Sequence, residues 1–189
     1  MCSSDLTWAF KMADDLPAPG SGTGLEAGTD PLAAFHSWFA EAQRKEASDP
    51  TAMTLATVDA RGQPAARMVL LKAADARGFV FYTNLESRKG GDLSANPRAA
   101  LLFYWKSLGR QVRIEGLTER VTDAEADEYF ATRARGAQLG AWASQQSRPL
   151  EGRLALEKRV AEYTLKFGLA AIPRPPDRKS TRLNSSHLV

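Results

Sequence analysis

Five short segments between Thr51 and Val121 constrain this chain most, because all five are rich in β-branched and aromatic residues. Asp59-Ala60-Arg61-Gly62 supplies a turn between the first two, which predicts a hairpin. Strand follows strand without regular crossover helices, which disfavours a doubly wound parallel sheet. We therefore expect a mainly β fold with helices (α+β), built as a small antiparallel Greek-key barrel. The segments are TAMTLATVD, QPAARMVLLK, GFVFYT, AALLFYWK (99–106) and RQVRIEGLTERV (110–121).

Helices are expected before, between and after these strands. Asp30-Pro31 forms a helix start, and the apolar residues that follow at helical spacing predict one buried face. A short helix is predicted for 87–95, ending before Asn96-Pro97. Thr122-Asp123-Ala124-Glu125 is a capping-box pattern that opens a helix reaching about residue 132. A further helix is predicted from about 150 to 167.

Both ends of the chain differ in character from the middle. Residues 1–29 are assigned to an N-terminal arm, because 12–29 is rich in Gly, Pro and Asp. After Pro173-Arg174-Pro175-Pro176, the stretch DRKSTRLNSSHLV (177–189) is polar and has no periodicity. A native disordered tail is one interpretation. We favour another: this tail and MCSSDL (1–6) resemble translated sequencing-library adapter, which would leave 30–176 as the domain and His187 outside any site.

Composition excludes several classes of protein. The chain has 189 residues, and its net charge of +3 suits anionic ligands without requiring nucleic acid. Two histidines and one cysteine leave little room for a protein-built zinc site, so we expect no metal. No apolar run approaches the roughly 20 residues of a membrane helix, and no signal peptide is evident. The single Cys2 is compatible with a reducing cytoplasm, where we expect the protein to act.

Two basic segments attract attention as candidate binding sites. On the strand RMVLLK, Arg67, Val69 and Leu71 point to one face, whereas Met68, Leu70 and Lys72 point to the other. Cations bracketing an apolar strand suit a ligand with a phosphate and a flat ring, although a strand with solvated charged ends is the simpler explanation. The segment from Tyr82 to Lys89 leaves a strand and enters a helix, whose N-terminus favours phosphate; a solvated basic turn is about equally compatible.

Weaker signals lie further along the chain. Gln111 begins a strand, and Gln146-Ser147 follow a Trp-containing loop; glutamine amides suit the polar edge of a flavin, although each is more often a surface residue. Tyr129 and Arg133 stand four residues apart and share a helical face if the helix persists that far. Together they could hold a second phosphate, but an exposed aromatic–cation pair is commoner.

Five blocks in order then resemble the signature blocks of the pyridoxamine 5′-phosphate oxidase family. They extend over a region from about Asp30 to Pro173. The resemblance implies an FMN-binding split barrel that works as a homodimer, with FMN in the cleft between subunits. The blocks are RMVLLK (67–72), FYTNLESRKGGDL (81–93), NPRAALLFYW (96–105), RQVRIEG (110–116) and YFATRARGAQLGAWASQQS (129–147).

The same resemblance implies roles for individual residues. The FMN phosphate would be bound by Arg67, Arg88 and Lys89, with hydroxyl contacts from Thr83 and Ser147. The strand residues Arg67, Met68, Val69, Leu70, Leu71 and Lys72, with Tyr82, would run along the flavin. Gln111 and Gln146 would bind polar flavin or ribityl atoms, one set coming from the partner subunit. The substrate phosphate would fall to Lys72, Tyr129, Arg133 and position 137, where Ala137 replaces a usual Ser and should weaken binding.

The implied reaction transfers hydride from C4′ of pyridoxamine or pyridoxine 5′-phosphate to the flavin, with dioxygen as acceptor and hydrogen peroxide as by-product. The family's C-terminal Arg-Leu-His-Asp motif has no counterpart here, so no catalytic residue is assigned. We therefore expect an incomplete domain, inactive as written, from a gene that encodes an active oxidase. The alternatives are a related flavin oxidoreductase with another substrate and an inactive FMN- or pyridoxal-phosphate-binding fragment. A nucleic-acid binder using Trp105, Lys106, Arg110 and Arg113 is disfavoured, because 22 acidic residues nearly balance 25 basic ones.

Overall fold

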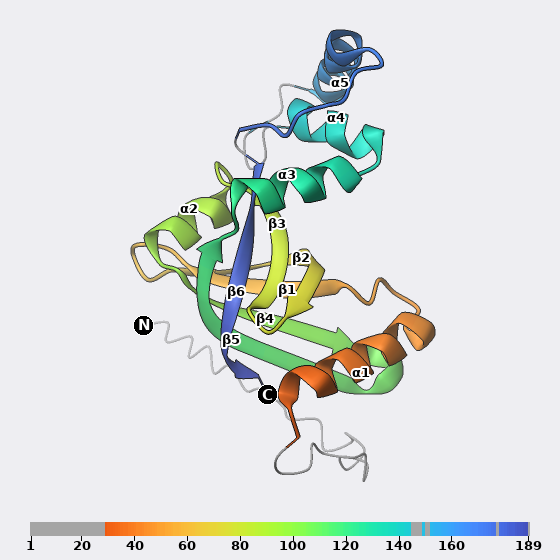
Figure 1. Ribbon diagram of the computed structural model, residues 1–189. Helices are drawn as coiled ribbons and strands as arrows, with labels where there is room; N and C mark the ends of the chain where they lie inside the picture. Colours follow the sequence, from red (N-terminus) through yellow and green to blue (C-terminus); the bar gives the residue numbers. More distant parts are fainter. Residues whose placement is uncertain (1–28, 145–148, 150–151, 177, 189) are drawn as a thin grey trace, which may run out of the picture.

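A closed antiparallel barrel of six strands forms the body of the computed structural model, which describes residues 29–144, 149, 152–176 and 178–188 (Figure 1). The strands follow one another around the barrel in the order β1-β2-β3-β6-β5-β4. Because β4 returns to pair with β1, the first four strands have the Greek-key order that the sequence predicts. The strands are β1 (Ala52–Val58), β2 (Pro64–Asp75), β3 (Gly78–Asn84), β4 (Arg98–Trp105), β5 (Arg110–Arg120) and β6 (Arg178–Leu188).

Helices cover the barrel at three places. α1 lies below the barrel in Figure 1, α2 lies beside it, and α3, α4 and α5 form a lobe above it. The predicted helix starts are confirmed: the Asp30 side chain accepts from the Leu32 amide, and Thr122 and Glu125 form a capping box. The helix α4 was not predicted. The helices are α1 (Pro31–Lys45), α2 (Arg88–Ala95), η1 (Lys106–Leu108), α3 (Asp123–Thr132), α4 (Arg135–Ala143) and α5 (Arg153–Phe167).

Aromatic side chains fill the barrel core and attach α1 to it. Phe35 of α1 is buried and meets the Phe79 ring edge-on, with 4.9 Å between ring centroids. Trp105 is also buried, and its Nε1 donates to the Pro50 carbonyl at 2.9 Å. The predicted apolar face of α1 therefore closes one end of the barrel, and burial of several aromatic rings stabilises this closure.

The lobe of α3, α4 and α5 has a small core of its own, to which Phe130, Leu139 and Ile172 contribute. The Trp142 Nε1 donates to the Pro173 carbonyl at 2.8 Å, so the proline-rich segment packs back onto α4. None of the helices in the described ranges is long and apolar enough to span a membrane. The expected N-terminal arm, residues 1–28 in particular, lies outside those ranges.

The last segment, residues 178–188, forms a strand, although the sequence predicts that the domain ends at residue 176 and is followed by a non-native tail. They form β6, which pairs with β3 on one side and β5 on the other and closes the barrel. Leu183 is completely buried in the main core, and the buried Arg182 contacts Glu125 at 3.3 Å. A polar segment without periodicity therefore forms the sixth strand of the barrel. Backbone pairing on both edges does not depend on apolar alternation, which explains why the sequence pattern missed it.

Two buried polar atoms of β6 lack hydrogen bonds within the described residues, and the strand packs very closely against Gly78. The Arg182 Nε and the Asn184 Oδ1 are buried without a hydrogen-bond partner among the described residues. The strand approaches Gly78 so closely that a Cβ there would lie 2.0 Å from the Leu183 carbonyl oxygen. Unsatisfied buried polar atoms destabilise a structure. The origin of residues 177–189 as a non-native tail stays a prediction.

Candidate functional site

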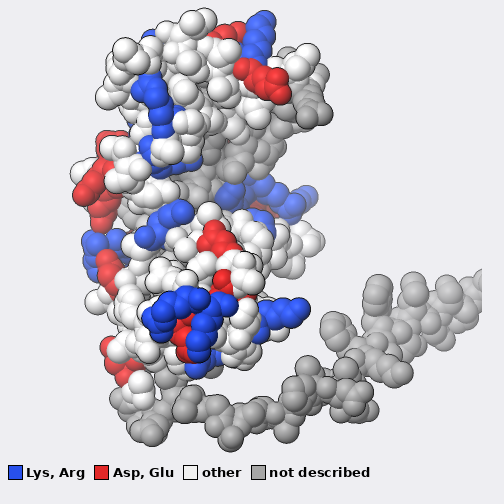
Figure 2. Space-filling view, turned by 90° about the vertical axis from the view of Figure 1, so that its right-hand side faces the viewer, with Lys and Arg blue, Asp and Glu red and all other residues white. Residues whose placement is uncertain are grey.

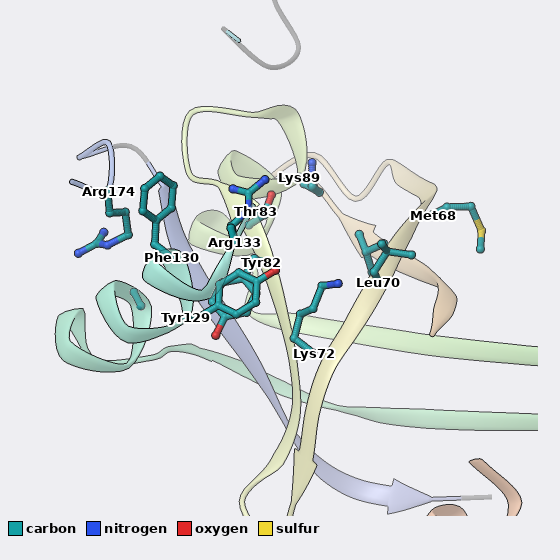
Figure 3. A pocket seen from close by; sticks show the side chains of 12 residues that line it. Met68, Leu70, Lys72, Tyr82, Thr83, Lys89, Tyr129, Phe130, Arg133 and Arg174 are labelled. Atoms are coloured by element: carbon teal, nitrogen blue, oxygen red, sulfur yellow. The ribbon is translucent and has the colours of Figure 1, made fainter. Parts of the chain in front are cut away.

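A cavity of about 320 Å³ lies between the barrel and the helical lobe. Figure 2 shows Lys and Arg side chains gathered where the molecule narrows between these two parts. β2 and β3 form one wall, and α3 with its C-terminal end forms the other (Figure 3). The lining residues are Met68, Val69, Leu70, Lys72, Tyr82, Thr83, Lys89, Ala126, Tyr129, Phe130, Arg133 and Arg174.

The alternation predicted for β2 is confirmed. Val69 and Leu71 are buried in the barrel core, whereas Met68, Leu70 and Lys72 face outward. Met68 is 61% exposed and Leu70 is 41% exposed, which is unusual for large apolar side chains on a strand. The outer face of β2 therefore presents apolar surface beside a cation, and this surface suits the flat face of a ring.

Four basic residues line the cavity, and among the described residues no carboxylate or imidazole lines it. Figure 3 shows the Lys72 amine and the Arg133 guanidinium reaching toward the same space from β2 and from the end of α3. Arg174, which sequence reasoning missed, is held by carboxylates of α3: its Nε donates to Asp127 at 2.6 Å, and its Nη2 donates to Asp123 at 3.1 Å. Two carboxylates therefore compensate the charge of Arg174, and the cavity's attraction for an anion depends on Lys72, Lys89 and Arg133.

Tyr82 of β3 and Tyr129 of α3 stack face to face inside the cavity. Their ring centroids lie 3.5 Å apart and their planes differ by 5°. Burial, followed by the neighbouring Tyr129, raises the pKa of Tyr82 to about 12. Burial also raises the pKa of Tyr129, and the nearby Arg133 opposes this shift. Both phenols are therefore protonated at neutral pH and can donate a hydrogen bond to an anion.

The N-terminus of α2 adjoins the cavity through Thr83 and Lys89. Ser87 is the N-cap, and its Oγ accepts from the Gly90 amide at 3.3 Å and donates to the Asn84 carbonyl at 2.6 Å. The Thr83 and Ser87 hydroxyl oxygens lie 3.4 Å apart. This arrangement is a capped helix start with hydroxyls and a cation beside it, a combination that suits phosphate.

Other predicted site residues do not line the cavity. Arg67 points to the opposite face of β2 and bonds there to Thr57 and Asp92. Leu71 is in the barrel core, and Gln111 is exposed on the outer face of β5. The remaining ones are Arg88, exposed at the first position of α2; Ala137, exposed on α4; and Gln146 and Ser147, which lie outside the described residues.

Known proteins with similar sequences belong to one family. The family model described as pyridoxamine 5′-phosphate oxidase matches residues 39–167. The pyridoxine/pyridoxamine 5′-phosphate oxidase of Caulobacter vibrioides is 64% identical over 154 residues, which cover 82% of this chain and 69% of that protein.

Solved structures with the same fold include PhzG of Burkholderia lata in complex with tetrahydrophenazine-1-carboxylic acid. Its TM-score is 0.80 at 32% identity, and the match covers 86% of this chain and 80% of that one. An FMN-binding protein from Nostoc punctiforme matches with a TM-score of 0.68 at 17% identity, over 85% of this chain and 84% of that one, which supports the fold alone. The split-barrel fold class expected from the sequence is confirmed, and the chain belongs to the pyridoxamine 5′-phosphate oxidase family.

Proposed function

We propose that this protein binds FMN and oxidises pyridoxamine or pyridoxine 5′-phosphate to pyridoxal 5′-phosphate. The observation that carries the proposal is the cavity itself, in which cations from separate elements meet exposed apolar surface on β2. FMN, when bound, supplies hydride acceptance from C4′ and reoxidation by dioxygen to give hydrogen peroxide. The protein's own residues supply position and electrostatics.

The residues present fit a flavin phosphate and ring. Met68 and Leu70 offer apolar contact to a planar ring, and the start of α2 with Thr83 and Lys89 offers donors to a phosphate. Arg88, at the first position of α2, adds a cation close to Lys89. We also assign two further residues to this phosphate site: Arg67, which lies on the other face of β2, and Ser147 through its hydroxyl.

The substrate phosphate is assigned to Lys72, Tyr129 and Arg133. Because the Tyr129 phenol stays protonated, it donates to a phosphate oxygen while the two cations neutralise the charge. Ala137 supplies no hydroxyl, and its position on α4 is away from the cavity lining. Its contribution is therefore limited to the backbone, and the predicted weakening of substrate binding stays a prediction.

A second copy of the chain completes the proposed site. The outer faces of β2, β4 and β5 carry large apolar side chains that are well exposed, among them Met68, Tyr104 and Leu117. Gln111 lies opposite Tyr104 in the β4–β5 register and so belongs to this same outer surface. We propose that a homodimer covers this surface and brings Gln111, with Gln146, to the partner's flavin. The cytoplasm is the proposed location.

A related flavin oxidoreductase with another substrate is the competing proposal. It is favoured by the similarity to PhzG, which was solved with a phenazine carboxylic acid rather than a vitamin phosphate. The two proposals differ in what the cations beside Tyr129 bind. A phosphate-dependent substrate preference supports the first proposal, whereas indifference to the phosphate supports the second.

The test uses the purified chain reconstituted with FMN under anaerobic conditions. The sequence alone predicts an inactive chain, but β6 closes the barrel, so we now expect pyridoxamine 5′-phosphate to bleach the flavin absorbance. Unphosphorylated pyridoxamine at equal concentration should do so far less. Tyr129→Phe removes one hydroxyl, and a hydrogen bond to a charged group contributes about 1.5–3 kcal/mol, so the apparent affinity should fall about 10- to 150-fold. Tyr163→Phe is the matched control, because Tyr163 packs in the lobe away from the cavity. Equal bleaching by both compounds would contradict the proposal, and bound FMN that is never bleached would replace it with a non-catalytic flavin-binding role.

A further inference from the structure

A buried polar cluster joins three elements at the end of β2, outside the cavity. Thr57 of β1 is 1% exposed and Asp92 of α2 is 6% exposed, and the Thr57 hydroxyl donates to the Asp92 carboxylate at 2.7 Å. The Arg67 guanidinium of β2 completes the cluster. Its Nη1 donates to the Thr57 hydroxyl oxygen at 2.6 Å, and its Nη2 donates to Asp92 at 3.3 Å.

A carboxylate as buried as Asp92 requires compensation, because removing a charge from water costs several kcal/mol unless it is paired and hydrogen-bonded. Here the compensation comes from Arg67 and Thr57. The cluster therefore connects the strand that carries Arg67 to the helix that carries Arg88 and Lys89. Its geometry determines how these cations are placed relative to one another.

The cluster leaves one edge of the guanidinium available. Arginine has five N–H donors. Nη1 donates to Thr57 and to the Leu55 carbonyl, and Nη2 donates to Asp92. The Nε–H and the second Nη2–H form an edge that can grip two oxygens of a phosphate side-on. The Arg67 side chain is 22% exposed, so the cluster does not enclose it.

We infer that Asp92 is a positioning residue for the cofactor phosphate: it holds the Arg67 guanidinium in one orientation and ties it to the start of α2. The inference rests on the proposed function, in which Arg67, Arg88 and Lys89 bind the FMN phosphate. Asp92 itself touches no ligand. Its effect is to remove the rotational freedom that a long arginine side chain otherwise loses when it binds.

A positioning role and a simple electrostatic effect predict opposite changes in phosphate affinity when Asp92 loses its charge, so a substitution can distinguish them. Asp92→Asn removes a negative charge near the phosphate site, so a field effect alone would tighten phosphate binding. If Asp92 positions Arg67, the same change releases the guanidinium and weakens binding. Thr57→Val removes the hydroxyl without changing charge and should weaken binding as well, whereas Thr57→Ser keeps the hydroxyl and should preserve it.

The experiment measures dissociation constants for FMN and for riboflavin, which lacks the phosphate, by quenching of flavin fluorescence. The FMN-over-riboflavin preference should fall about tenfold in Asp92→Asn, or about 1.4 kcal/mol, with riboflavin affinity unchanged within about twofold. Asp59→Asn is the matched control, since Asp59 makes its contacts in the turn after β1, and it should keep the wild-type preference. Thermal melts of the apo proteins verify folding.

Each outcome bears on a different claim. A preference that is unchanged or increased in Asp92→Asn would overturn the inference, as would equal weakening of both flavins. If Asp92→Asn fails to fold, the comparison of Thr57→Val with Thr57→Ser decides, because loss of preference in Val with rescue in Ser supports positioning and equal behaviour overturns it. A wild-type chain that binds riboflavin as tightly as FMN would instead refute the proposed phosphate site itself.

Discussion

Replacing Leu183 with Ala tests whether the last strand is part of the barrel. Leu183 is completely buried, belongs to the main core cluster, and lies opposite Phe79 on β3 and Thr118 on β5. A buried Leu→Ala change removes the transfer free energy of the lost methyl groups and leaves a cavity, at a total cost of roughly 2–5 kcal/mol. We take about 3 kcal/mol as the expected loss of unfolding free energy.

That loss is large relative to the stability of an ordinary domain, which is about 5–15 kcal/mol. For a chain of this length, 1 kcal/mol shifts the melting temperature by about 2–4 °C, so Leu183→Ala should lower it by roughly 6–12 °C. The matched control is Leu165→Ala on α5. Leu165 is 84% exposed and lies outside the proposed dimer surface, so its truncation should cost less than about 1 kcal/mol.

Urea unfolding followed by tryptophan fluorescence measures both variants, with the slope of the transition checked against wild type. The reasoning requires the Leu183 variant to lose at least about 2 kcal/mol more unfolding free energy than the Leu165 variant. Equal and small losses would refute it. Residues 178–188 would then contribute no strand, and the prediction that the domain ends at residue 176 would be supported.

Two further predictions concern titration. Side-chain hydrogen bonds from Lys45 and then Arg110 lower the pKa of Glu41 from 4.5 to about 2, so this stabilisation is complete above about pH 4.5 and is lost as the pH falls through 2. Glu41→Gln should therefore flatten the acid side of the stability–pH curve in that window, and an unchanged acid limb would contradict the assignment. Burial raises the pKa of Tyr82 to about 12, so Tyr82→Phe should remove a late step from the ultraviolet titration of the phenols, and an unchanged late step would contradict the assignment.

Local signals account for the parts of the fold that were predicted. The first five strands carry β-branched and aromatic residues, and the starts of α1 and α3 carry side-chain caps that need only neighbouring residues. α4 has no such signal, because Ala134 stands at its N-cap position and makes no side-chain cap. β6 shows the same limit for strands: its pairing depends on two distant edges, and a polar segment gives no periodicity to detect.

The same distinction between local signals and long-range contacts applies to the candidate site. Tyr82, Lys89, Tyr129 and Arg133 were predicted as site members and do line one cavity, but the Tyr82–Tyr129 stack joins β3 to α3 and no spacing in the sequence indicates it. Arg174 was missed because its approach to the cavity depends on carboxylates of α3, about fifty positions earlier. Membership of a site can be read from local motifs, whereas its geometry depends on elements that meet only in the folded chain.

The alternation of side chains along β2 also determines which of its cations can reach the same anion. Arg67 and Lys72 stand five positions apart, and because this offset is odd they occupy opposite faces of β2. At about 3.3 Å per residue they lie roughly 16 Å apart along the strand. One phosphate cannot bridge that distance. Arg67 turns to the Thr57–Asp92 cluster, whereas Lys72 turns to the cavity with Tyr129 and Arg133. We therefore expect the two cations on this strand to bind two separate anions, as the proposed phosphorylated cofactor and phosphorylated substrate would require.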